Sequence, residues 1–383
     1  MKLTKLEYSE YRGKNEEWIL SDCTLGDINL IVGKNATGKS RTLNVIRSLA
    51  SLLSEATNLP WRDGNYYTEF NTDGETFAYS LEYHNNMVTS EELKINGTRF
   101  LVRNDDGAGN IKANELNQTI KFKTQTDQVA AFSKRDSIQH PFLERLHEWG
   151  QGVTKYEFGS QLGKGSLLIK GRKLEDDTIT KLNLKDTEKV VGIFLQGNEE
   201  FPDKFKNTII ADMKAIGYDL EDIDVDIPKG ISLISNIEIP GAISALYVKE
   251  SDLQNKTYQM VMSQGMFRAL SVLIQINYGL LANLSVCVLI DDIGEGLDFE
   301  RSSSLVKVLI EKARKSSIQL IMTTNDRFIM NGVPLEYWIL LERRGSKCIN
   351  YNVRNSKKMF DSFESTGLNN FDLFSSGYYL NNE

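Results

Sequence analysis

Runs of hydrophobic residues along the chain predict alternating short strands and amphipathic helices. INLIV at 28–32 is a short β-branched run, and RTLNVIRSLASLL at 41–53 has apolar residues at helical spacing. Toward the other end, VCVLI at 286–290 predicts a buried strand, and an amphipathic pattern that begins at Gln264 predicts a long helix. These elements indicate an α/β protein.

The middle of the chain follows a different pattern. ETFAYSLEYHNN, SEELKING and TRFLVRNDD alternate apolar and polar residues around Asn, Gly and Asp turns, which predicts an antiparallel β segment near 66–125. HPFLERLHEWG and FPDKFKNTIIADMKAIG predict short helices, and PLEYWILLERRG with KCINYNVRN predicts a late hairpin. No heptads are sustained, so we expect no long coiled coil.

The composition is that of an ordinary globular protein, with 40% apolar and 25% charged residues. The 45 basic and 52 acidic side chains give a net charge of −7, which does not indicate nucleic-acid binding, so any such contact would have to be local. Paired basic residues are predicted to be solvated surface: Lys134 and Arg135, Arg343 and Arg344, Lys357 and Lys358. Three cysteines, no secretion signal and no membrane-spanning stretch predict a cytoplasmic protein without membrane contact.

A glycine-rich loop separates the first buried strand from the helix that follows it. Its residues, which we call the phosphate loop, match the pattern G-x-x-x-x-G-K-[ST]: Gly33, Lys34, Asn35, Ala36, Thr37, Gly38, Lys39 and Ser40. In such loops, backbone N–H groups at a helix N-terminus cradle phosphates, and the glycines let the main chain approach closely. Lys39 would bridge the β and γ phosphates, and Ser40 would bind Mg²⁺.

Two further segments carry candidate chemistry. The strand at 286–290 stops at an acidic pair, Asp291 and Asp292, where Mg²⁺ and an attacking water would be expected. A Ser-x-Gly turn, Ser263–Gly265, opens the long helix; we call it the signature turn. Ser263 is predicted to cap that helix, but capping does not account for Gln264, Gly265 and Arg268 following in this order.

Four segments resemble motifs of ATP-binding-cassette (ABC) ATPases and occur in the family's order. They are GKNATGKS for the Walker A motif, MSQGMFR for the signature, VLIDD for the Walker B motif and EGLD for the D-loop. Asp291 and Asp298 are seven residues apart (298 minus 291), as in that superfamily. TTND at 323–326 follows the next predicted strand, where the family has its switch histidine. The opening KLEYSEYRGK, with Tyr11 and Arg12, is similar to the soluble SMC, RecF and OLD-type branch.

The resemblance covers about residues 1 to 345 and implies an α/β fold, an ABC-type P-loop ATPase head with a mixed central sheet, flanking helices and a helical signature lobe. The nucleotide-binding lobe would comprise 1–155 and 268–345, and the inserted helical and signature lobe 156–267. Residues 346–383 would form a C-terminal strand and an aromatic tail, which is either docked on its own core or a hook for a partner.

The same resemblance implies roles for individual residues. ATP and Mg²⁺ would be the cofactors, with Ser40 and Asp291 holding the ion and Asp292 in the general-base position beside Lys39. The further nucleotide contacts would be Arg41, Arg12 and Asn325.

Ser263 and Gly265 would reach ATP bound to an opposite subunit, with Asp298 at the seam. The resemblance therefore implies a head-to-tail homodimer, or a higher homo-oligomer, with ATP sandwiched between subunits.

The sequence departs from the family at three places. Asp292 stands where most relatives have Glu, and Asn325 stands where most have His. A shorter base and an uncharged amide both predict slow turnover. For the family's glutamine loop, Gln139 is the favoured candidate over Gln128 and Gln161.

Resemblance to compact AAA-type ATPases of bacterial anti-phage operons implies a switch ATPase that regulates a separate effector, a nuclease or toxin. One alternative is a DNA repair or recombination ATPase acting directly on DNA. Another is a scaffold that binds ATP without hydrolysing it, and a transporter subunit fits least. No room remains for a TOPRIM nuclease, and no other nuclease constellation is visible in the sequence.

Overall fold

The computed structural model describes residues 1–170, 185–228, 242–284 and 286–381. The chain forms two compact units. Unit 1 comprises Met1–Val153, Val286–Leu289 and Ser317–Glu383, and unit 2 comprises Thr154–Ser285 and Ile290–Ser316. The expected lobes divide the chain at other places, since the helices at 264–281 and 299–314 fall in unit 2.

Among the described residues, the largest sheet has 14 strands. In spatial order these are β10 (Val153–Glu157), β15 (Cys287–Asp291), β16 (Gln319–Thr323), β3 (Ile28–Gly33), β17 (Trp338–Arg344), β18 (Lys347–Tyr351), β2 (Trp18–Thr24), β1 (Lys2–Glu10), β4 (Gly64–Thr72), β5 (Glu75–His84), β6 (Met87–Ile95), β7 (Thr98–Arg103), β8 (Ala108–Ala113) and β9 (Gln118–Lys123). The last residues of β10 and β15 belong to unit 2.

The sheet is mixed, as expected for this fold class. β3 pairs in parallel with β16 on one side and β17 on the other, and all its residues are buried, as is usual for central parallel strands. From β4 to β9 the strands are antiparallel, and β4 to β8 alternate buried with more exposed residues. This meander confirms the antiparallel β segment of the predicted fold.

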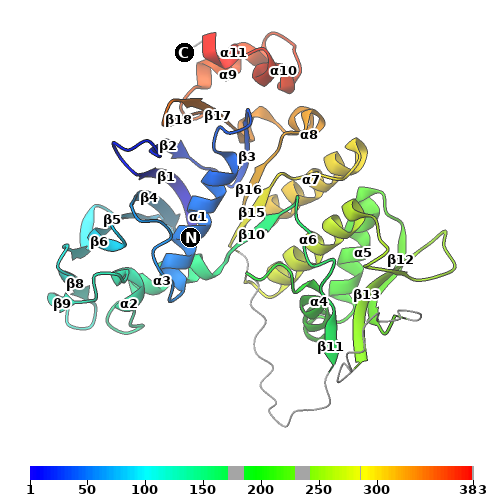
Figure 1. Ribbon diagram of the computed structural model, residues 1–383, viewed down its shortest axis with the longest axis horizontal. Helices are drawn as coiled ribbons and strands as arrows, with labels where there is room; N and C mark the ends of the chain where they lie inside the picture. The colour runs from blue at the N-terminus through cyan, green and yellow to red at the C-terminus, as the bar shows by residue number, and fades with distance from the viewer. Residues whose placement is uncertain (171–184, 229–241, 285, 382–383) are drawn as a thin grey trace. The chain divides into compact units, whose positions relative to one another are not determined.

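Helix α1 (Lys39–Ser54) begins at the last two residues of the phosphate loop and packs against α3 (Pro141–Gln151), as Figure 1 shows. The approach is close at Gly150, where a Cβ would lie 2.5 Å from the carbonyl oxygen of Ala50. Aromatic side chains fill much of the core of unit 1, with Trp18, Trp149 and Tyr66 almost fully buried.

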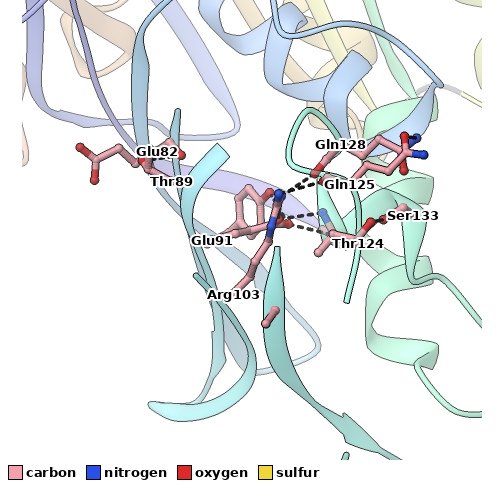
Figure 2. Close-up of polar contacts among 12 residues, drawn as sticks. Glu82, Thr89, Glu91, Arg103, Thr124, Gln125, Gln128 and Ser133 are labelled. Carbon is pink, nitrogen blue, oxygen red and sulfur yellow. Dashed lines mark hydrogen bonds and ion pairs between the residues drawn. The ribbon is translucent and has the colours of Figure 1, made fainter. Parts of the chain in front are cut away.

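A buried ion pair fixes the meander to the short helix α2 (Ala130–Ser133). Glu91 and Arg103 are fully buried, and Glu91 accepts hydrogen bonds from the backbone N–H groups of Ala130 and Ala131, both at 2.7 Å. Figure 2 shows Arg103 beside Glu91, with its guanidinium donating to the carbonyls of Gln125 and Gln128. The segment before α2 is therefore anchored to β6 and β7.

The C-terminal segment of unit 1 is helical after β18. Its elements are α9 (Lys357–Glu364), α10 (Asn370–Ser375) and α11 (Tyr378–Asn381), which lie beyond β17 and β18 in Figure 1. Asn370 Nδ2 donates to the carbonyl of Val333, just after α8 (Arg327–Gly332) and before the short helix η1 (Leu335–Tyr337). Leu373 and Tyr379 are buried, so the tail docks on its own unit.

Unit 2 contains helices α4 (Val190–Glu200), α5 (Lys204–Ile216), α6 (Gln264–Leu281) and α7 (Phe299–Arg314), with a small sheet of β11 (Leu168–Lys170), β13 (Ala242–Glu250), β12 (Leu220–Asp226) and β14 (Thr257–Tyr258). α6 is buried around almost its whole circumference, as an apolar central helix should be. Lys312 of α7 bonds both Asp212 of α5 and Asn277 of α6.

With 18 residues, α6 is the longest helix in the described part of the chain, which agrees with the expected lack of a long coiled coil. None of the helices within the described ranges is long and apolar enough to cross a membrane.

Candidate functional site

The phosphate loop connects β3 to α1 in unit 1. Gly33 ends the strand, and a Cβ there would lie 2.6 Å from the Thr37 hydroxyl and 2.8 Å from the carbonyl oxygen of Leu341. Gly38 has φ 108° in the left-handed region, and its Cβ would lie 2.9 Å from the Trp18 ring. Both glycines are therefore required by space, as the motif predicts.

Lys39 lies across the loop rather than out in solvent. Its side chain is almost fully buried, and Nζ donates to the carbonyl of Gly33 at 2.8 Å and to that of Lys34 at 3.4 Å. The first turn of α1 contains no acidic residue, so the positive end of the helix dipole faces the loop without compensation. The Lys39 ammonium group and the N-terminus of α1 thus lie where the motif predicts phosphate.

Arg41, one residue beyond Ser40, is held by an acidic and an aromatic partner. It forms an ion pair with the buried carboxylate of Glu10, and its guanidinium lies 4.8 Å from the centre of the Trp18 ring. Arg12 lies two residues after Glu10 on the same chain segment, is exposed, and donates from Nε to the Ser9 hydroxyl at 2.7 Å. The structure thus pairs Arg41 with Glu10, the last residue of β1, which lies two residues before Arg12.

Asn325 also belongs to unit 1. It follows β16, whose carboxyl end lies beside that of β3, since Thr323 pairs with Ile31. The Asn325 side chain is exposed, and its neighbour Asp326 caps α8 by accepting from the N–H of Phe328. Asn325 and the phosphate loop therefore lie at the same edge of the sheet, where open α/β sheets bind ligands.

The acidic pair ends β15, in the part that belongs to unit 2. Asp291 is largely buried, its carbonyl accepts from the N–H of Phe158 at 3.0 Å, and Lys155 Nζ lies 3.7 Å from its carboxylate. Asp292 has φ 50°, a left-handed conformation that Asp tolerates better than most residues. The strand therefore ends abruptly, and the chain turns at the expected general base.

The signature turn and the loop before Asp298 pack together within unit 2. Ser263 caps α6 by accepting from the N–H of Met266 at 3.2 Å, as predicted. A Cβ at Gly265 would lie 2.3 Å from the carbonyl oxygen of Gly296. Asp298 caps α7, and the hydrogen bond from the Arg301 N–H lowers the pKa of its carboxyl below the ordinary value.

The structure also shows what Arg268 does, which the sequence pattern left unexplained. Its guanidinium is buried and donates to three main-chain carbonyls: Gly159 at 2.7 Å, Ser160 at 2.9 Å and Glu295 at 2.9 Å. Arg268 thus joins α6 to the loop after β10 and to the loop before Asp298. No local sequence signal marks these partners.

The loop after β10 also contains a better candidate for the family's glutamine loop than Gln139. Gln161 follows β10 by four residues (161 minus 157), and its Oε1 accepts from Gln264 of the signature turn at 3.2 Å. Gln139 instead precedes α3, where its carbonyl accepts from Asn114 at the turn between β8 and β9. The contact with the signature turn favours Gln161 over Gln139.

The candidate site residues fall into two groups. The phosphate loop, Arg41, Arg12 and Asn325 belong to unit 1, whereas the acidic pair and the signature turn belong to unit 2. Within unit 1, the close packing at Gly33 and Gly38 and a helix N-terminus without an acidic residue in its first turn fit a phosphate group.

No protein-family model matches the sequence, and no curated protein matches it significantly. Solved structures with a similar fold do exist. The Smc head bound to the C-winged helix domain of ScpA has a TM-score of 0.50 and 14% identity, with 94% of this chain and 100% of that chain covered. The Pyrococcus furiosus Smc head with an extended coiled coil, bound to the C-terminal domain of ScpA, has a TM-score of 0.50 and 13% identity, with 95% and 99% covered. The chain has the fold of an SMC head domain, the ABC-type P-loop ATPase fold.

Proposed function

We propose that this chain is a cytoplasmic switch ATPase that binds ATP, hydrolyses it slowly, dimerises head to tail in the ATP state and regulates a separate effector protein. The phosphate loop is the observation that carries the proposal. Lys39 is held over the loop by the carbonyls of Gly33 and Lys34, and the N-terminus of α1 adds its backbone amides and a partial positive charge. This arrangement suits a polyphosphate better than any neutral ligand.

Hydrolysis would use the candidate catalytic and metal-binding residues. When bound, Mg²⁺ would neutralise phosphate charge, and Ser40 and Asp291 are the residues that would hold it. Asp292 would take the proton from the attacking water, but its side chain is one methylene shorter than Glu. The amide of Asn325 can donate a hydrogen bond, yet it cannot lend positive charge to the transition state. Slow turnover and a long-lived ATP state follow.

In the ATP state, the chain would form a homodimer and act on a partner protein. Ser263 is exposed at the start of α6, so its hydroxyl is accessible to a second copy of the chain. The Smc heads described above are each bound to a domain of ScpA, which supports partner binding by this fold. Resemblance to ATPases of anti-phage operons favours a nuclease or toxin as the partner.

Isothermal titration with MgATP tests the central claim. Lys39→Ala should abolish binding, because the loop loses the charge that pairs with the phosphates. Lys121→Ala removes a lysine from an exposed position on β9 and should bind as the wild type does. Equal ATP affinity in all three proteins would exclude this loop as the nucleotide site.

A scaffold that binds ATP without hydrolysing it is the second candidate, favoured by the left-handed backbone of Asp292 and by the uncharged Asn325. Single-turnover hydrolysis separates the two candidates. Direct action on DNA gains no support from the basic pairs, because Arg135 pairs with Glu144 and Lys357 with Asp361. ATP-dependent DNA binding with a steep salt dependence would reverse that judgement.

A further inference from the structure

One residue of the phosphate loop adopts a backbone conformation that its side chain disfavours. Ala36 has φ 63°, in the left-handed region, where the Cβ of an alanine crowds the backbone. Two residues later Gly38 is also left-handed, but as a glycine it needs no support. The loop therefore requires a contact that keeps Ala36 in place.

The hairpin β17–β18 lies beside the loop because of the register of the sheet. β17 pairs in parallel with β3 up to Leu341 opposite Gly33, where β3 ends. β17 continues to Arg344, so its last residues run alongside the loop. Arg343 lies two residues beyond Leu341 and thus on the same face of the strand.

Two hairpin side chains donate to consecutive carbonyls of the loop. Arg343 Nη1 donates to the carbonyl of Ala36 across 3.4 Å, and the Cys348 thiol donates to that of Thr37 at 3.1 Å. A shorter bond of 2.9 Å from Arg343 Nε to the carbonyl of Gly345 fixes the guanidinium in its own turn. The long bond to Ala36 is thus made by a group that is already oriented.

A cavity of about 530 Å³ lies on this side of the loop. Residues 34–37 form one wall, the hairpin another, and Tyr379 and Leu380 of α11 complete the lining. Such a space leaves the loop room to relax sideways. Arg343 lines the cavity and bonds the loop there.

We propose that Arg343 is a positioning residue for the phosphate loop: it holds the Ala36 carbonyl and so keeps Ala36 in the left-handed conformation that the loop needs to receive phosphate. The inference rests on the proposed function. Without Arg343, a fraction of the molecules relaxes at Ala36, and the apparent ATP dissociation constant rises in inverse proportion to the fraction that stays competent to bind.

The test measures ATP affinity by titration and KM by phosphate release. Arg343→Ala should weaken ATP binding and raise KM by roughly five- to ten-fold, with kcat nearly unchanged. A change of this size corresponds to the strain of one alanine held in the left-handed conformation. Arg343 is exposed, so the thermal midpoint of unfolding should not move. Arg344→Ala is the matched control, since Arg344 donates to Glu342 and to the Tyr351 hydroxyl within the hairpin.

Ala36→Gly in the Arg343→Ala background separates positioning from electrostatics. Glycine adopts positive φ without strain, so the double variant should recover most of the wild-type affinity. Glycine cannot replace a lost positive charge, so a double variant as weak as Arg343→Ala would overturn the inference. Wild-type affinity in Arg343→Ala would also overturn it. A wild-type protein that does not bind ATP would instead overturn the proposed function together with the inference.

Discussion

Arg268 Nη1 donates a hydrogen bond of 2.9 Å to the carbonyl oxygen of Glu295, so the helix that begins at the signature turn is joined to the loop before Asp298. The remaining nitrogens of the guanidinium bond the carbonyls of Gly159 and Ser160. A Cβ at Gly296 would lie 2.9 Å from the same nitrogen, so a residue larger than glycine would crowd the guanidinium. One buried side chain thus fixes two loops of unit 2.

Arg268→Met should lower the free energy of unfolding by about 2 to 4 kcal/mol, because three buried carbonyls lose their donor. ATP hydrolysis should fall further than ATP binding, since the phosphate loop lies in unit 1. Urea unfolding and phosphate release measure the two effects. Lys315→Met, which changes an exposed cation at the end of α7, should stay within about 0.5 kcal/mol of wild type. Equal stability of the two variants would contradict the account of Arg268.

Asp292→Asn should retain ATP binding and lose hydrolysis by about 10²- to 10⁴-fold, the usual contribution of a general base. Asn tolerates the left-handed backbone at φ 50°, so the variant should fold as the wild type does. Single-turnover phosphate release is the measurement. A variant that hydrolyses ATP at the wild-type rate would show that another group takes the proton.

Ser263→Arg should prevent ATP-dependent dimerisation while leaving ATP binding to the monomer intact. The arginine fills the signature turn and removes the cap of α6, which costs about 1 kcal/mol. Light scattering in the Asp292→Asn background with and without ATP gives the mass. Leu253→Arg places the same side chain at another exposed position of unit 2 and should still dimerise. A dimer that forms regardless of Ser263→Arg would exclude the signature turn from the interface.

Glu91→Gln and Arg103→Met should each lower the free energy of unfolding by about 3 to 5 kcal/mol, because each leaves a buried group without its partner. The double variant should be less destabilised than the sum of the two. Burial raises the pKa of Glu91, which means that keeping this carboxyl ionised already costs stability. A double-mutant cycle by urea unfolding measures the coupling, and additive losses would show that the pair does not interact.

Asp63 should contribute stability that depends on pH. Its carboxylate accepts from Lys14 at 2.6 Å, and this hydrogen bond lowers the pKa of Asp63 below the ordinary value. A lowered pKa stabilises the fold above the ordinary pKa near 3.9, and the gain disappears as the pH falls through the folded value. Asp63→Asn should therefore lower the thermal midpoint more at pH 7 than at pH 3. An equal loss at both values would assign the effect to packing.

The phosphate loop and the acidic pair could be located from sequence because their signals are local. A β-branched run, a glycine pattern and an amphipathic helix are contiguous at 28–54, and the structure has β3 and α1 there. The antiparallel meander was equally predictable, since alternation of apolar residues directly reflects a sheet with one buried face. The roles assigned to individual site residues stay predictions.

Contacts between distant segments could not be predicted in this way. Arg268 bonds a residue 109 positions away, and Gln264 bonds Gln161 across 103. The bonds to Gly159 and Ser160 end on backbone carbonyls, which any residue type would offer. The sequence likewise did not show that Gln161, rather than Gln139, contacts the signature turn, because that contact also joins distant segments.

The position of β3 between β16 and β17 bears on how the protein is synthesised. β3 emerges from the ribosome early, yet both of its sheet neighbours come from residues after 318. Until they arrive, the strand that holds the phosphate loop lacks both flanking strands, and non-local pairing of this kind is slow to form. A nascent or prematurely terminated chain therefore carries the complete loop sequence without a folded nucleotide site, so a truncated product should be unable to compete for ATP.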